Sequence, residues 1–447
     1  MPLLPVTHTL GKRLSLSAII RGLFLFFAFT AWSITGPANV ALAILCALFL
    51  AHWPAEWGWL RRDPAFQLMV SVFLVCALLA LRAIWLFPTI ADQQWVFAWA
   101  WSSPFLFVVT AWWLRRDPQL AWPLMAAGVM GLIFGAVRKS DWSLTARVLD
   151  GMRYDFGHAA LGLAIIASVM LLGLLLMRAR ITGLVLRGRR RPLLGWALWI
   201  TGVASLVVIL VVTQSRGAAL GLAIAGTLYG LALLVRSRAR VGLAPRQTRL
   251  ALVTAALFIV LAGALLWSTM DRQESDWHEL TVGSEGGDLS YKGSVAIRLN
   301  LLAVGLEAFS ERPLLGFGPG TSTTEFLVPH GLVQVSDYHR IHAPEFSHLH
   351  SVLVETLTRF GLLGLLIGAL LIAVLVGAYR RLWSDPRIPA DLRALLTLGG
   401  IMTLLYYLYD FRLVNQDLRF FLILFLGIVY GLSIAEPEES AAGGTNG

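Results

Sequence analysis

Three polar segments of the 447-residue chain carry side chains that could do chemistry. Arg216 lies in the short connection TQSRGAALGL, Arg298 lies near the start of SVAIRLNLLAVGLEAFSERP, and His350 lies where HAPEFSHLHSVLVET enters an apolar run. An arginine can grip a phosphate with two parallel hydrogen bonds. An imidazole near half-protonation can take a proton from a hydroxyl group. These residue types indicate phosphate binding together with general base chemistry.

Both arginines also have a purely structural interpretation. Arg216 could extend along the membrane surface and place its charge among the lipid headgroups. Arg298 could lie on a solvated helix face or pair with Glu307 or Glu311. The sequence alone leaves these alternatives open.

Three histidines, His342, His348 and His350, lie close together before one apolar run. A metal site would need a third ligand such as Glu345, and the spacing matches no established zinc pattern. We therefore predict no metal and no cofactor. His350 is the best placed base because it lies at the mouth of the apolar run, and His348 is an additional substrate-binding candidate.

The elements that position these residues are membrane helices. Hydrophobic residues make up 57% of the chain and charged residues 14%, which excludes an ordinary soluble domain. About twelve apolar runs of roughly 17 to 22 residues are each long enough to cross ~30 Å of hydrocarbon as a helix. We predict an all-α integral membrane protein whose spans are 16–34, 37–53, 66–87, 95–114, 118–137, 157–177, 193–213, 217–235, 250–268, 352–377, 393–410 and 418–434.

Lysine and arginine cluster in every second connection, which is typical of cytoplasmic loops. This alternation places both termini in the cytoplasm and the long insert between spans nine and ten on the outer, periplasmic side. The predicted division is spans one to nine at 1–268, a periplasmic loop with short helices at 269–350, spans ten to twelve at 351–434 and a cytoplasmic tail at 435–447.

One predicted outer connection, 138–156, is unexpectedly basic. Its charges could pair with the aspartates of the same loop, or they could contact anionic lipid phosphates. The net charge of +10 requires no nucleic acid, because the cytoplasmic arginine clusters account for most of it. The basic residues of this connection are Arg138, Lys139, Arg147 and Arg153, and the aspartates are Asp141, Asp150 and Asp155.

Two local patterns concern the surroundings of His350. The glycine run LLGFGPGTST at 314–323 predicts a tight turn that shapes the outer loop, because neither a strand nor a Lys-Ser/Thr ending accompanies it. Glu355 and Arg359 are four residues apart on the tenth span, which favours an ion pair on one helix face.

Asp410, Arg412 and Asp417 flank the last predicted outer turn. They could orient Arg216 or bind sugar, and an ordinary interfacial ion pair is at least as good an interpretation. They are not assigned a catalytic role.

The ordered set TQSRGAALGL, AIRLNLLAVGLEAFSERPLLGFGPG and HSVLVETLTRFGLLGLL resembles the signature region of the O-antigen ligase and O-antigen polymerase superfamily. The resemblance covers roughly residues 205–375. The family's core arginines and histidine correspond to Arg216, Arg298 and His350. Ser351 departs from the pattern, because relatives often have asparagine after the histidine.

The resemblance implies a fold like that of GT-C-type glycosyltransferases in the bacterial inner membrane. It implies glycosyl transfer at the periplasmic face, from an undecaprenyl-pyrophosphate-linked glycan to an acceptor hydroxyl, without a nucleotide sugar. Arg216 and Arg298 would stabilise the charge on the departing pyrophosphate, and His350 would deprotonate the acceptor, giving inversion without a metal.

The first functional hypothesis is therefore an O-antigen ligase of lipopolysaccharide biosynthesis whose acceptor is lipid A-core. The basic connection around Arg138 to Arg153 favours it, because lipid A-core is phosphorylated. A polymerase or a protein O-oligosaccharyltransferase would share the donor and differ in the acceptor. A transporter of the same lipid would need ionisable groups within its helices and would be expected to contain internal repeats. The predicted spans are nearly free of charge, with Arg82 the clearest exception, which disfavours a transporter. Two lipid-borne substrates also predict a cavity that opens sideways to the membrane.

Overall fold

The computed structural model describes most of the chain. The described residues are 16–144, 153–158, 160–183, 185–186, 189–239, 294–334, 348–413 and 415–436, with six single positions between 253 and 264. Several sequence-based assignments lie outside them: almost all of the ninth span at 250–268, the first part of the periplasmic loop at 269–293, Arg147, Glu345 and the tail from 437.

Within the described residues, ten helices are long and apolar enough to cross a membrane. A shorter apolar helix, α8 (Ala160–Leu176), has 17 residues. These helices confirm the predicted all-α membrane fold. The ten are α1 (Leu16–Ser33), α2 (Thr35–Leu60), α3 (Pro64–Leu86), the composite Pro88–Arg116, the composite Pro118–Lys139, α10 (Pro192–Thr213), α11 (Arg216–Ala239), α16 (Val352–Ser384), α17 (Ala390–Tyr409) and α18 (Gln416–Ser433).

Proline and capping residues set several helix starts. The Asp63 side chain accepts a hydrogen bond from the amide of Phe66 at 2.8 Å, and Pro64 occupies the first turn of α3. Proline also opens α10 and both composite spans. The composites consist of η1 (Pro88–Ile90), α4 (Ala91–Ser102), η2 (Ser103–Leu106) and α5 (Phe107–Arg116), and of η3 (Pro118–Leu120) and α6 (Ala121–Lys139).

Eleven of the twelve predicted spans correspond to helices among the described residues. The fourth is not one continuous helix, because the 3₁₀ turn η2 with Pro104 divides it. A small antiparallel pair, β1 (Val185–Leu186) with β2 (Arg189–Arg190), was not predicted. The shorter remaining elements are η4 (Trp142–Leu144), α9 (Arg178–Thr182), α14 (Ser294–Glu311) and the π-helical turn η5 (Thr323–Leu327).

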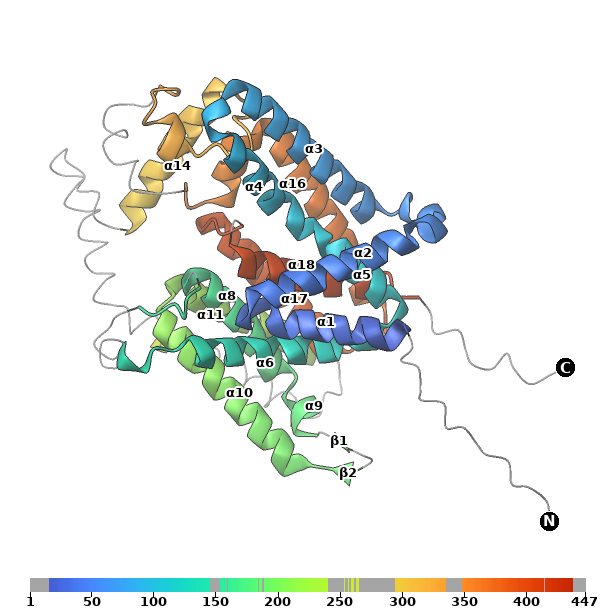
Figure 1. Ribbon diagram of the computed structural model, residues 1–447. Helices are drawn as coiled ribbons and strands as arrows, with labels where there is room; N and C mark the ends of the chain where they lie inside the picture. Colours follow the sequence, from blue (N-terminus) through green and yellow to red (C-terminus); the bar gives the residue numbers. More distant parts are fainter. Residues whose placement is uncertain are drawn as a thin grey trace, which may run out of the picture.

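The bundle has two distinct ends (Figure 1). α14 lies at one, where α11 and α16 begin, and we call it the α14 end. The pair β1–β2 and α9 lie at the other, the β-pair end. Arginines at the β-pair end form ion pairs, including Arg115 with Glu56 at 3.1 Å and Arg180 with Asp391 at 2.7 Å. Two of the basic clusters of the sequence, those that contain Arg115 and Arg180, thus lie at this end.

The helix α14 ends at Glu311, shortly before Pro313. Its residues Leu301 and Val304 are buried in a small apolar cluster that also contains Val354 of α16. A Cβ on Gly305 would come within 2.2 Å of the Val354 side chain, so glycine allows α14 to pack closely on α16.

The glycine-rich turn predicted at 314–323 crosses a break in α16. Gly361 has φ +62°, and the helix is interrupted there. The Leu362 amide donates to the Pro313 carbonyl at 2.8 Å, and the Gly318 amide donates to the Arg359 carbonyl at 2.9 Å. The crossing segment therefore satisfies backbone groups that the broken helix leaves unpaired.

Candidate active site

The loop before α16 meets the turn after α17 at the α14 end. Nδ1 of His350 lies 3.3 Å from Oδ1 of Asp410, and Nε2 of His348 lies 3.9 Å from the same oxygen. The two imidazole rings are 4.3 Å apart between centroids. Residues sixty positions apart in the sequence thus form one polar cluster.

Asp410 is completely buried and held on both oxygens. The Tyr406 hydroxyl donates to Oδ2 at 2.8 Å and Nε of Arg412 donates to it at 3.1 Å, while the Phe411 amide donates to Oδ1 at 2.9 Å. Burial alone would raise the pKa of Asp410, but the hydrogen bonds from His350, Tyr406 and Arg412 outweigh it and lower the pKa to about 2. The carboxylate therefore remains ionised and fixed at neutral pH.

The backbone aims the His350 side chain at this carboxylate. His350 has φ +53°, a left-handed conformation that is uncommon for residues other than glycine. Ser351 then returns to extended backbone at the N-cap of α16, without a capping hydrogen bond from its side chain. If Nδ1–H donates to Asp410, the lone pair of the imidazole lies on Nε2, which is the nitrogen able to act as a base.

His348 differs from His350 in its electrostatic surroundings. Burial, followed by the nearby charges of His350 and Arg412, lowers the pKa of His348 to about 3, with Asp410 acting in the opposite direction. His348 is therefore a neutral imidazole at physiological pH. Its ring also contacts Phe411, with centroids 5.9 Å apart.

The same cluster contains the side chains that could hold a metal ion. One ligand atom from each of His348, His350 and Asp410 lies within 4.8 Å of the others. The sequence analysis placed the third ligand at Glu345, which lies outside the described residues, and missed Asp410. Arg412 donates to the same carboxylate and already supplies a positive charge there.

A buried ion pair supports the His350 loop. Nε of Arg359 donates to Oε2 of Glu355 at 2.5 Å, and both side chains are 1% exposed, which confirms the predicted pair. The other Glu355 oxygen accepts from the Leu349 amide at 2.8 Å. Nη1 of Arg359 donates to the Pro319 carbonyl at 2.6 Å. The pair thus joins the residue before His350 to the glycine-rich turn.

The two candidate phosphate ligands also lie at the α14 end. Arg216 is the first residue of α11 and is half-buried, after Gln214 in a left-handed conformation. Arg298 is half-buried in the second turn of α14. α11 packs on α17, which leads into Asp410, and α14 packs on α16. The helices that bear the arginines therefore contact the helices that bear the histidine–aspartate cluster.

The basic connection divides into two parts. Nη2 of Arg153 donates to the Gln214 carbonyl at 3.4 Å, which links the connection to the turn before Arg216. Arg138 donates to the Ser33 carbonyl at 2.6 Å, and Nζ of Lys139 lies 2.9 Å from Nε2 of His158. Arg138 and Lys139 thus belong to a second polar cluster.

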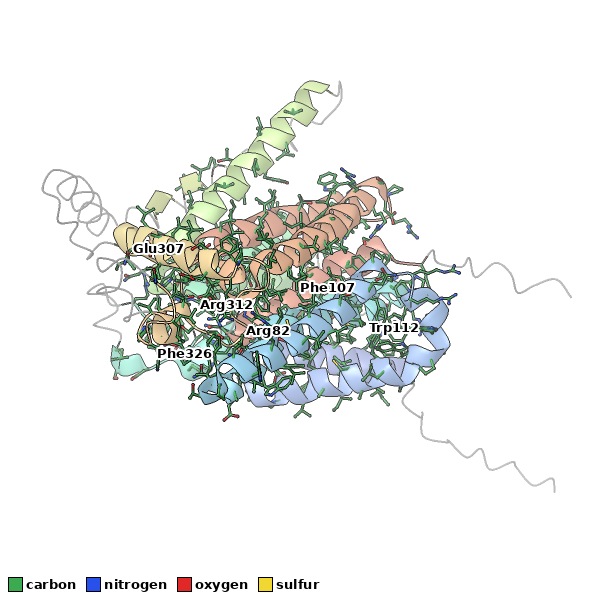
Figure 2. All side chains as sticks on the ribbon, turned by 90° about the horizontal axis from the view of Figure 1, so that it is seen from above. Arg82, Phe107, Trp112, Glu307, Arg312 and Phe326 are labelled. Carbon is green, nitrogen blue, oxygen red and sulfur yellow. The ribbon has the colours of Figure 1, made fainter. Side chains whose placement is uncertain are left out.

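Arg82, the exceptional charge inside a span, helps to hold the glycine-rich turn. Its Nη1 donates to the Gly316 carbonyl at 3.0 Å. Figure 2 shows Arg82 and Arg312 near the same end of the bundle, and the Arg312 guanidinium lies 5.1 Å from the centroid of the Phe317 ring. The structural surroundings of Arg82 explain its position without a transport pathway.

The fold and the cluster define a multi-pass helical membrane protein with a histidine–aspartate pair at one end of the bundle. Residues 200–369 match the model of the family described as O-Antigen ligase. This part of the chain is similar to the O-antigen ligase and polymerase family, and the match includes the segments that carry Arg216, Arg298 and His350. A comparison with curated proteins gives no match.

The matched region includes Arg216, Arg298 and His350 but ends before Asp410. Asp410 is the functional candidate that the sequence undervalues: it indicates a partner of Arg216, a sugar ligand or an interfacial ion pair, but not a partner of His350. An acidic residue at the end of an apolar run was the feature of the sequence that could have indicated a functional role for Asp410. Its partner could not be identified, because His350 lies sixty residues earlier in the sequence.

Proposed function

We propose that this protein is an O-antigen ligase of lipopolysaccharide biosynthesis. It transfers a glycan from undecaprenyl pyrophosphate to lipid A-core at the periplasmic face of the bacterial inner membrane. The family domain supports glycosyl transfer in general. The observation that carries the specific proposal is the fixed contact of His350 with the ionised, buried Asp410 at the α14 end.

In the proposed reaction, Nε2 of His350 removes the proton from the acceptor hydroxyl. The acceptor oxygen forms a bond to C1 of the donor sugar while the bond from C1 to the pyrophosphate oxygen breaks, so the anomeric configuration inverts. Asp410 holds the tautomer of His350 and stabilises the imidazolium that forms. The proton leaves later from His350 to water.

The departing pyrophosphate gains negative charge in the transition state. Arg216 and Arg298 bind it and stabilise that charge, so the scheme needs no metal. Arginine suits this role because it stays protonated and presents a planar set of donors. Neutral His348 contacts the sugar or the acceptor through hydrogen bonds.

The acceptor would approach from the side of the basic connection. Arg138, Lys139, Arg147 and Arg153 contact its phosphates, and the hydrogen bond from Arg153 to Gln214 supports a position beside Arg216. In this orientation the α14 end is periplasmic, residues 269–350 form the periplasmic loop, and both termini are cytoplasmic. The arginine-rich β-pair end fits the positive-inside rule.

The test is transfer by the purified full-length protein with undecaprenyl-pyrophosphate glycan, lipid A-core and EDTA. We expect His350→Ala, Arg216→Ala and Arg298→Ala each to lower the rate by about a hundredfold or more. His52→Ala and Arg387→Ala, both away from this cluster, are matched controls and should keep the wild-type rate.

The products distinguish the alternatives. Glycan attached to lipid A-core supports the ligase, whereas a longer glycan on the donor lipid identifies a polymerase. Glycan attached to an added acceptor protein, but not to lipid A-core, identifies a protein O-oligosaccharyltransferase. Movement of intact donor across a vesicle membrane without transfer would identify a transporter.

A further inference from the structure

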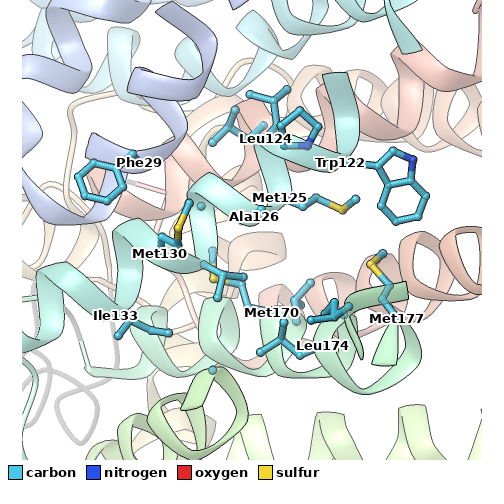
Figure 3. A pocket seen from close by; sticks show the side chains of 18 of the residues that line it. Phe29, Trp122, Leu124, Met125, Ala126, Met130, Ile133, Met170, Leu174 and Met177 are labelled. Carbon is cyan, nitrogen blue, oxygen red and sulfur yellow. The ribbon is translucent and has the colours of Figure 1, made fainter. Parts of the chain in front are cut away.

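A large apolar groove lies on another side of the bundle. It is lined by helices α1, α6, α8, α9, α10, α17 and α18 and has a volume of about 1050 Å³ (Figure 3). Tryptophan apart, Arg180 and Thr201 are the polar side chains in its lining. Neither α11 nor α14, the helices that bear Arg216 and Arg298, contributes to it.

The lining is adaptable as well as apolar. Four of the nine methionines in the chain line the groove, and Figure 3 shows them from neighbouring helices. Methionine side chains are flexible and polarisable, so they adjust to hydrocarbon of varied shape. The four are Met125, Met130, Met170 and Met177.

An ion pair lies at the β-pair end of the groove. Arg180 donates to both carboxylate oxygens of Asp391, at 2.7 and 3.3 Å. The Arg180 guanidinium also lies 4.7 Å from the centroid of the Trp122 ring, which lines the groove. With its charge already paired within the protein, this end is poorly suited to a phosphate.

The opposite end of the groove lies beneath the second polar cluster. Val137 lines the groove directly before Arg138 and Lys139, and Arg138 donates to the Ser33 carbonyl beside the lining residue Trp32. Nζ of Lys139 contacts Nε2 of His158, and Nδ1 of His158 contacts the Asp417 carboxylate. The backbone carbonyl of Asp417 accepts a hydrogen bond from the indole of Trp32. Cationic side chains thus lie where a membrane groove reaches the α14 end.

We propose that this groove binds the acyl chains of the phosphorylated acceptor lipid, with a phosphate of the same lipid at Arg138 and Lys139. The inference rests on the proposed ligase function and assigns the acyl chains of the acceptor a place apart from the donor pyrophosphate. The donor pyrophosphate is bound by α11 and α14, away from the groove. The volume of about 1050 Å³ can accommodate hydrocarbon chains of a membrane lipid, and the cationic side chains at the α14 end of the groove favour the phosphorylated acceptor.

Binding is measured with the full-length protein in nanodiscs of zwitterionic phospholipid. The probes are lipid A and undecaprenyl phosphate, each in competition with the bulk phospholipid. Ala126→Trp places an indole in the groove at an exposed lining position, and Ala43→Trp places one at an exposed position of α2 outside the groove. The two variants add the same surface to the membrane-facing protein.

We expect wild-type protein and Ala43→Trp to retain lipid A equally, and Ala126→Trp to bind it about tenfold more weakly. A tenfold loss corresponds to removing the contact of about two methylene groups. Equal binding by the three proteins, or a selective loss of undecaprenyl phosphate instead, would overturn the proposal.

A second measurement places a photo-crosslinking residue at Met130, which lines the groove and is 57% exposed. Unlike Ala126→Trp, it does not require the groove to be filled by a larger side chain. Crosslinks to lipid A support the proposal, and crosslinks to undecaprenyl phosphate or only to bulk phospholipid contradict it. Both measurements are independent of transfer. If lipid A binds the groove and no transfer to lipid A-core occurs, the ligase function is wrong while the lipid site stands.

Discussion

Replacing Asp410 with asparagine removes a negative charge next to the proposed base and keeps the shape of the side chain. Oδ1 of Asp410 lies 3.3 Å from Nδ1 of His350. For unit charges at this separation, an effective dielectric constant of about 20 gives an attraction of about 5 kcal/mol. This is the electrostatic stabilisation that the imidazolium would lose in the variant.

A loss of 5 kcal/mol would correspond to more than a thousandfold in rate, since each tenfold costs about 1.4 kcal/mol. The His350 ring is 15% exposed, so water screens part of the interaction. We therefore expect Asp410→Asn to lower the single-turnover transfer rate by about a hundred- to a thousandfold. Binding of the donor should change little, because Asp410 does not contact the leaving group in this scheme.

Tyr406→Phe is the matched control, since it removes one hydrogen bond to Asp410 but keeps the charge. We expect a loss of about tenfold or less from this variant. Both proteins should be compared by thermal melting to exclude unfolding. If Asp410→Asn transfers glycan within about threefold of the wild-type rate, or if Tyr406→Phe is equally impaired, Asp410 does not act through its charge on His350.

Three further predictions concern metal, pH and stability. Prolonged dialysis against EDTA should leave the transfer rate unchanged, and a loss restored by Zn²⁺ would instead identify His348, His350 and Asp410 as metal ligands. Burial lowers the pKa of His348, so the folded state loses stability as pH falls from about 6.5 towards about 3. In melting experiments, His348→Gln should reduce this dependence of the melting temperature on pH. An unchanged dependence in the variant would contradict the prediction. Arg359→Met leaves Glu355 buried without its partner, and should destabilise the protein by about 3–5 kcal/mol in detergent unfolding, whereas Glu355→Gln/Arg359→Met should recover part of the loss. A cost below about 1 kcal/mol for the single variant would mean that water reaches Glu355.

The spans could be predicted because length and apolar composition are local properties of the sequence. α3 and α10 begin at Pro64 and Pro192, close to their predicted starts. The break at Gly361 could not be found in this way, because the segment that fills it begins at Pro313, far back in the chain. An apolar run looks the same whether its backbone hydrogen bonds lie within the helix or extend to a distant segment.

The site shows the same division. Residue types and order indicated Arg216, Arg298 and His350, and the fold places all three at one end of the bundle. Asp410 gained its importance only from tertiary contacts, since its partner His350 lies sixty residues earlier in the sequence. The basic connection looked uniform in sequence, yet the structure directs Arg153 to the turn before Arg216 and Arg138 towards the groove.

The buried pair Glu355–Arg359 explains how these distant segments can act together. Glu355 binds the Leu349 amide next to His350, and Arg359 binds the Pro319 carbonyl in the turn that follows α14. The helix that bears Arg298 and the loop that bears His350 are thus connected through one ion pair. Because such a pair stabilises little beyond its own desolvation, we expect its main contribution to be fixing the position of the proposed base, His350, relative to the proposed phosphate ligand, Arg298. A rate loss in Glu355→Gln/Arg359→Met that exceeds its loss of stability would be the signature of that positioning.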